Sequence, residues 1–182
     1  QQVSSAASDV YKRQEKEIFL ENPEVQPKLE GYDYILQRQL KPEAPKKYFE
    51  ILNEIGIIPT SMIDISDGLS SELLHISKSS KVSVKIYEDK IPIDYTVMNK
   101  AAELNLNPIF CALNGGEDYE LLFTIDQKEY SKLEKDPDFT IIGHITDKSE
   151  GNFFISNDNK AHELTAQAVS YTHLRAHETH EN

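Results

Sequence analysis

The stretch Ser61–Leu69, SMIDISDGL, constrains this chain most, because it places two carboxylates and a hydroxyl where a strand gives way to a helix. Ile63 and Ile65 are β-branched and apolar, as a buried strand requires. Leu69, Leu73 and Ile76 then recur at i, i+4 and i+7, which is the spacing of one helix face. The sequence therefore predicts a strand, a short polar turn and an amphipathic helix, in that order.

Asp64, Ser66 and Asp67 lie at this predicted junction. Ser66 or Asp67 is a suitable N-cap for the helix. The free N–H groups at a helix start attract phosphate, but Asp64 and Asp67 would repel it unless a divalent cation lies between them. The spacing thus favours a metal-bridged phosphate site, with an ordinary strand, an acidic cap and the turn glycine Gly68 as the structural alternative.

A second polar segment, NGGEDYELLF, begins at Asn114. Its glycines, Gly115 and Gly116, lack Cβ atoms and let backbone approach a ligand closely. Glu117 and Asp118 follow them and precede a predicted buried strand over residues 119–125. A tight turn with exposed acids is the structural alternative here.

These two segments, with IGHITD at residues 142–147 and RQLKP at residues 38–42, resemble the C-terminal half of bacterial thiamine-monophosphate kinase. The resemblance runs from about residue 15 to residue 168 and does not cover the N-terminal half of such an enzyme. It implies the C-terminal domain type shared with aminoimidazole ribonucleotide synthetase. In this family the γ-phosphoryl group of ATP is transferred to thiamine monophosphate, giving thiamine diphosphate, with magnesium ions held between two domains.

The resemblance also implies roles for four side chains. Asp64 and Asp67 resemble magnesium ligands, and Ser66 resembles a hydroxyl that contacts ATP. Glu117 resembles a residue that touches the thiamine substrate. No catalytic base is assigned, since the acceptor is already a phosphate oxyanion. The family further implies a homodimer formed through the N-terminal half, and this chain alone is expected to be inactive.

Other polar residues near the motifs are expected to be structural. Asp118 and Glu120 match the family motif, and we expect them to make structural hydrogen bonds. His75 and His144 are expected to pack or to lie on a helix face. Cys111, between two apolar neighbours, is expected in the core and not as a nucleophile.

Helices and strands are interspersed without βαβ regularity, which predicts an α+β fold with a mixed β-sheet covered by helices. Four predicted strands, at residues 62–65, 82–86, 119–125 and 139–145, are expected to form one sheet. Proline and glycine interrupt the segment before residue 42, which is typical of a connector. The predicted organisation is a non-native tail (1–14), a connector (15–41), a domain of the kinase type (42–168) and a second non-native tail (169–182).

The formal net charge is −12, which argues against binding to nucleic acid or to an anionic membrane surface. One cysteine excludes an internal disulfide and fits a cytoplasmic protein. No apolar run approaches the roughly 20 residues of a membrane span. His173, His177 and His180 share a helical spacing that could suggest zinc, but the tail around them has no apolar period.

Two other functions remain open from the sequence. One is another ATP-using synthetase of the same superfamily. The other is a non-catalytic domain that binds metal and phosphate. The GGEDYEL segment at residues 115–121 favours the kinase.

Overall fold

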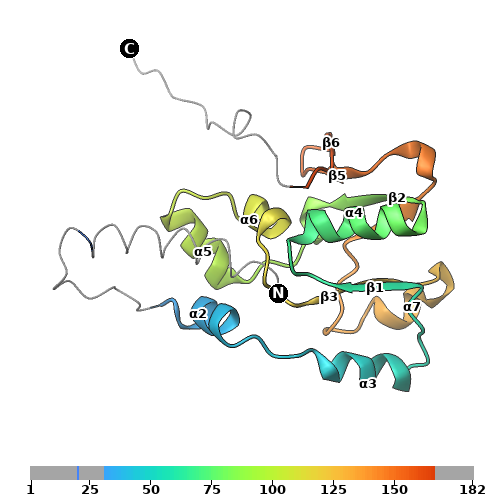
Figure 1. Cartoon of the computed structure of the whole chain (residues 1–182), viewed down its shortest axis with the longest axis horizontal. Helices are drawn as coiled ribbons and strands as arrows, with labels where there is room; N and C mark the ends of the chain where they lie inside the picture. The colour runs from blue at the N-terminus through green and yellow to red at the C-terminus, as the bar shows by residue number, and fades with distance from the viewer. Residues whose placement is uncertain (1–19, 21–30, 167–182) are drawn as a thin grey trace, which may run out of the picture.

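The structure, a computed structural model, describes residue 20 and residues 31–166 (Figure 1). Helices alternate irregularly with short strands along this part of the chain. The longer elements are α2 (Asp33–Leu40), α3 (Lys46–Glu54), β1 (Ser61–Asp64), α4 (Leu69–Ser80), β2 (Ser83–Tyr87), α5 (Tyr95–Glu103), α6 (Pro108–Asn114), β3 (Leu121–Thr124), α7 (Tyr130–Leu133), β4 (Gly143–Thr146), β5 (Phe153–Ile155) and β6 (Ala161–Glu163). Three short 3₁₀ turns are η1 (Glu88–Lys90), η2 (Gln127–Glu129) and η3 (Lys148–Glu150).

Strands β1 and β3 form a two-stranded antiparallel sheet with helices on both faces. Ile63 lies opposite Leu122, and both contribute to the main apolar core with α4. Met62 lies opposite Phe123, and both pack in a second core with α3 and α7. Because successive side chains of a strand point to opposite faces, Ile63 and Leu122 face the main core, and Met62 and Phe123 face the second core. Helices α4 and α3 accordingly lie on opposite sides of this sheet (Figure 1).

The other strands form a four-stranded sheet in the order β4-β2-β5-β6. Strand β2 is antiparallel to β4 and parallel to β5, and β5 is antiparallel to β6, so this sheet is mixed. The α+β class with a mixed sheet and covering helices is confirmed.

The expectation that all four predicted strands form one sheet is wrong. Of residues 139–145, only those from Gly143 onward belong to a strand, and that strand pairs with β2. The ring of Phe139 instead packs edge-on against Phe123 and Tyr48, with 5.8 Å between ring centroids in each pair. This contact holds the start of the segment in the second core, so β1 and β3 form a separate sheet.

The amphipathic helix predicted after the first motif is α4. Its residues Leu69, Leu73 and Ile76 are buried, and they share the main core with Val84 and Ile86 of β2. Roughly 1.5–3 kcal/mol is gained for each large apolar side chain buried in this way. The helix is therefore fixed against both β1 and β2, which places its N-terminus beside the end of β1.

Helix α2 lies in the segment predicted to be a connector. The side chain of Ile35 is 0% exposed, and it belongs to the main core together with Tyr32. This part of the segment predicted to be a connector thus packs in the same core as α4. Because the segment is charged and interrupted by prolines, its sequence did not indicate that Tyr32 and Ile35 are buried.

No helix in residues 31–166 is long and apolar enough to cross a membrane. The predicted tails at residues 1–14 and 169–182 lie outside the described residues, as do His173, His177 and His180. The proposed domain boundaries stay predictions.

Candidate phosphate and metal site

The two polar motifs lie side by side, joined backbone to backbone beyond the ends of β1 and β3. The Ile65 N–H donates to the Glu120 carbonyl at 2.9 Å, and the Tyr119 N–H donates to the Ile65 carbonyl at 2.9 Å. The Glu117 N–H donates to the Ser66 carbonyl at 2.7 Å. Residues 51 to 55 positions apart in the sequence are thus brought into direct contact at the predicted site.

Two glycines permit this close approach. A Cβ on Gly116 would lie 2.3 Å from the Ser66 carbonyl oxygen, and one on Gly68 would lie 3.0 Å from the carbonyl carbon of Asn114. Gly68 also has φ of +112°, a conformation that side chains disfavour. The glycines therefore serve backbone contact between the motifs, whereas the sequence suggested that Gly116 allows the approach of a ligand.

The four predicted site residues surround this junction. Asp64 ends β1 and is exposed, Asp67 is exposed in the turn, and Ser66 between them is half-buried. Glu117 is exposed and has φ of +62°. The structure therefore brings Ser66 and Glu117 together through the backbone and leaves three carboxylates facing solvent.

The donor set is compatible with magnesium. Mg²⁺ commonly takes one or two protein carboxylates and completes its octahedron with water and phosphate oxygens. Exposed Asp64 and Asp67 provide such carboxylates. Within the described residues, no group of three or more His, Cys, Asp or Glu side chains is arranged to hold a metal on its own. These residues suit an ion shared with a phosphate ligand better than a closed all-protein site.

The predicted helix cap is wrong. The N-cap position of α4 is Gly68, and neither Ser66 nor Asp67 caps it. Glu72 in the first turn instead accepts hydrogen bonds from the Asp67 N–H at 3.0 Å and from the Ser66 hydroxyl at 3.3 Å. No capping signal in the sequence indicates Glu72, because it lies five and six residues after these partners, whereas a capping box has a spacing of three.

Arg38 connects α2 to the second motif. Its Nη2 donates to the Asp118 carbonyl at 3.2 Å, and its guanidinium forms an ion pair with the Glu120 carboxylate. The structural hydrogen bonding expected of Glu120 is confirmed. The Asp118 side chain is 3% exposed, so it is not presented to solvent like Glu117.

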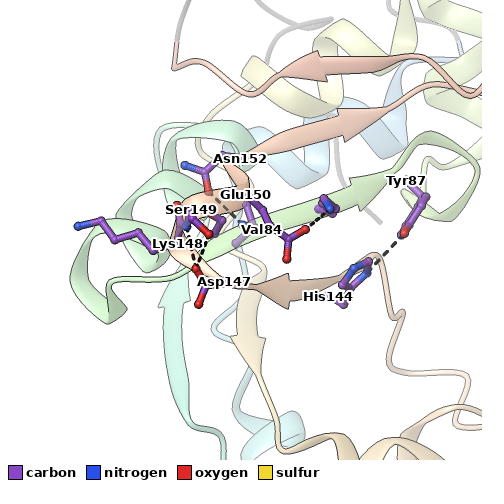
Figure 2. Close-up of polar contacts among 10 residues, drawn as sticks. Val84, Tyr87, His144, Asp147, Lys148, Ser149, Glu150 and Asn152 are labelled. Atoms are coloured by element: carbon purple, nitrogen blue, oxygen red, sulfur yellow. Dashed lines mark hydrogen bonds and ion pairs between the residues drawn. The ribbon is translucent and has the colours of Figure 1, made fainter.

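The third motif, residues 142–147, supports the four-stranded sheet (Figure 2). The His144 ring stacks on Tyr87 with 5.8 Å between centroids. Asp147 accepts from the N–H and hydroxyl of Ser149 at 2.9 and 2.6 Å, and the hydroxyl bond chiefly lowers the pKa of this carboxyl. This motif therefore maintains a strand and the following turn, and the packing role expected of His144 is confirmed.

Two hollows lie elsewhere on the described surface. One, of about 990 Å³, lies between β3 and β4 and is lined mainly by apolar residues of the two sheets. The other, of about 480 Å³, is bordered by η1, α5 and the start of α6. Neither is lined by Asp64, Asp67 or Glu117, so these two hollows lie apart from the candidate site.

Cys111 is expected to be unreactive in the folded protein. Its side chain is 2% exposed in α6, and burial raises the pKa of the thiol from 9.0 to about 11. The thiolate is the reactive form, so a disulfide reagent at pH 8 should modify Cys111 only after denaturation in urea. Rapid modification of the native protein would contradict this expectation.

The same pKa shift predicts weaker folding at high pH. The folded protein keeps a thiol proton that the unfolded chain loses above about pH 9, so the free energy of unfolding should decline between pH 9 and 11. Urea unfolding at pH 8 and pH 10 measures the decline. Cys111→Ala is the control, and it should remove the part of the decline in unfolding free energy that comes from the thiol.

A scan against protein-family models found no match. Curated relatives are nevertheless clear. The chain is 36% identical over 158 residues to a thiamine-monophosphate kinase of Pyrococcus horikoshii, covering 87% of this chain and 45% of that protein. It is 38% identical over 154 residues to the thiamine-monophosphate kinase of Buchnera aphidicola subsp. Schizaphis graminum, covering 80% and 43%. The chain thus spans about half the length of the curated relatives it matches.

Solved structures agree with the sequence relatives. Thiamine monophosphate kinase from Aquifex aeolicus matches with a TM-score of 0.62 and 28% identity, over 87% of this chain and 49% of that one. The complex of AaThiL with AMPPCP and TMP matches with a TM-score of 0.64 and 28% identity, over 90% and 47%. HypE in complex with ATP, at 16% identity and a TM-score of 0.56 over 69% and 41%, shares the fold alone. In sequence and in fold, the chain is therefore a relative of the thiamine-monophosphate kinases that corresponds to about half of such a protein, as expected for the C-terminal half.

Proposed function

We propose that this chain is the C-terminal half of a thiamine-monophosphate kinase. The complete protein then transfers the γ-phosphoryl group of ATP to thiamine monophosphate and forms thiamine diphosphate and ADP. The backbone pairing of the two polar motifs carries this proposal, because it joins the segment that holds Asp64, Ser66 and Asp67 to the segment that holds Glu117. The kinase relatives and the AaThiL complex with AMPPCP, an ATP analogue, and TMP support it over a related synthetase or a purely binding domain.

Each site residue has a role that its chemistry allows. Asp64 and Asp67 would hold Mg²⁺, which neutralises charge on the two phosphate groups that must approach each other. Ser66 would contact ATP, and Glu117 would contact the thiamine substrate. The acceptor oxygen of thiamine monophosphate is already an anion, so no side chain needs to remove a proton from it. The work of these residues is alignment and charge balance.

The partners follow from this activity. They are ATP and thiamine monophosphate, with Mg²⁺ as the metal, and neither nucleic acid nor a membrane. We further propose that the complete enzyme is a homodimer formed through its N-terminal half. A buried free thiol at Cys111 fits a cytoplasmic protein.

Asp64→Asn and Asp67→Asn test the site in the complete enzyme. Loss of one charged contact at a phosphoryl-transfer site should lower turnover about 100-fold, equivalent to ~3 kcal/mol of transition-state stabilisation. Thiamine diphosphate formation is measured across a magnesium titration, and urea unfolding checks that each variant is folded. Asp89→Asn, on the exposed turn η1, is the matched control and should behave like the parent. Unaltered turnover and magnesium dependence in both site variants would refute the assignment.

A further inference from the structure

Glu72 is a buried carboxylate that the proposed mechanism does not use. Its side chain is 2% exposed, although glutamate is almost never buried without hydrogen-bond donors. Donors come from the site itself, the Asp67 N–H at 3.0 Å and the Ser66 hydroxyl at 3.3 Å. In the second of these bonds the Ser66 hydroxyl is the donor and Glu72 Oε1 the acceptor, so the Ser66 oxygen keeps its lone pairs for other partners.

The same turn is held from its other side by the second motif. The Ser66 carbonyl accepts from the Glu117 N–H at 2.7 Å, and Gly116 lies against that carbonyl. Gly68 lies against Asn114 at the end of α6. The turn between β1 and α4 is therefore fixed between Glu72 on one side and residues 114–117 on the other.

Helix α4 gives Glu72 a rigid base. Leu69 and Leu73, on either side of Glu72 in the helix, are buried in the main core, and the Glu72 N–H donates to the Gly68 carbonyl at 3.2 Å. The Asp67 N–H donates to a carboxylate held on this helix, so the hydrogen bond ties the Asp67 peptide to α4. The exposed carboxylates of Asp64 and Asp67 flank this fixed peptide.

We propose that Glu72 is a positioning residue, which holds the Asp67 backbone and the Ser66 side chain so that Asp64 and Asp67 can share one metal ion. The metal part of this inference rests on the proposed function. The hydrogen-bond part does not. Glu72 itself touches neither metal nor substrate in this role.

Hydrogen exchange of backbone amides in this chain tests the inference directly. The Asp67 amide is bonded to Glu72, whereas the nearby Ile65 amide is bonded to the Glu120 carbonyl and serves as an internal reference. Glu72→Ala should speed exchange at Asp67 about tenfold or more relative to Ile65, the effect of losing one charge-assisted hydrogen bond. Glu72→Gln retains a side-chain oxygen acceptor and should keep Asp67 protected.

Magnesium chloride is then titrated against the chain while the amide signals of Asp64 and Asp67 are followed. Glu72→Ala should weaken the response several-fold, and Glu72→Gln should largely restore it. Ser77→Ala is the matched control on the same helix, because Ser77 is buried and donates to the Val82 carbonyl at 2.7 Å away from the turn. It should lower the urea midpoint without affecting Asp67 exchange.

The results separate the inference from the proposed function. If Glu72→Ala behaves like Ser77→Ala, with only a lower midpoint, Glu72 has a general structural role and the inference fails. It also fails if Glu72→Gln loses protection at Asp67 as fully as Glu72→Ala. If Glu72→Ala frees the Asp67 amide while Asp64→Asn and Asp67→Asn leave the magnesium response unchanged, the metal site is refuted and the hydrogen-bond role stands. Should Glu72→Ala not fold, Glu72→Asp, one methylene shorter, replaces it in the same measurements.

Discussion

Thiamine diphosphate is expected to form when this chain is joined to the N-terminal half of a thiamine-monophosphate kinase, and not when the chain is supplied alone. The chain covers 45% of the Pyrococcus horikoshii relative, and the carboxylates of Asp64, Asp67 and Glu117 are exposed on it. In-line transfer requires the donor and acceptor phosphates to be held together. Such alignment is worth roughly 7–11 kcal/mol, or at least 10⁵-fold in rate. About half of the protein, with only part of the contacts to the two ligands, should not provide this alignment.

The measurement is formation of thiamine diphosphate from ATP, thiamine monophosphate and magnesium, followed by chromatography. The N-terminal half of the Pyrococcus horikoshii relative is a suitable partner, fused in the order of the complete protein. A fusion carrying both Asp64→Asn and Asp67→Asn controls for activity of the added half. Turnover by the isolated chain would overturn the two-half account, while an inactive but folded fusion would count against the kinase proposal.

Much of the site could be predicted because its signals are local. The apolar run of β1 and the i, i+4, i+7 pattern of α4 predict a strand followed by an amphipathic helix, and both elements are confirmed, although the helix begins after Gly68 and not after Ser66 or Asp67. The two glycines of the second motif indicated that backbone lies close to another group there, expected to be a ligand, and in the structure Gly116 lies against the Ser66 carbonyl. Each of these features depends on residues close in sequence or on the steric freedom of glycine.

The errors concern contacts between distant residues. Gly68, with φ of +112°, takes the N-cap position of α4 expected for Ser66 or Asp67, and the Asp67 N–H donates to Glu72 instead. Phe139 packs in the second core and so leaves β3 paired only with β1. The apolar periodicity of a single segment reveals neither the bond from Asp67 to Glu72 nor the packing of Phe139, since both depend on how formed helices and strands pack together.

Gly116→Ala is expected to damage both the fold and the site. A Cβ at this position would lie 2.3 Å from the Ser66 carbonyl oxygen, closer than nonbonded carbon and oxygen atoms tolerate. The obstacle is backbone and not the end of a flexible side chain, so β1 and the second motif must separate. Overpacking of this kind costs on the order of 3 kcal/mol, and the separation also breaks the bond from the Glu117 N–H to the same carbonyl.

Gly56→Ala is the matched control for Gly116→Ala. Gly56 follows α3 with φ of +68°, and a Cβ there would meet nothing within 4 Å. Only backbone strain of roughly 1 kcal/mol is expected from this change. Urea unfolding should therefore show a larger loss of unfolding free energy for Gly116→Ala than for Gly56→Ala, although of these two glycines only Gly56 has a positive φ. Equal losses would mean that conformational strain, and not contact between the motifs, determines the requirement for glycine.

In the complete enzyme, Gly116→Ala should also lower turnover at least 100-fold even where it remains folded, because Ser66 and Glu117 are moved apart, while Gly56→Ala should leave turnover near the parent value.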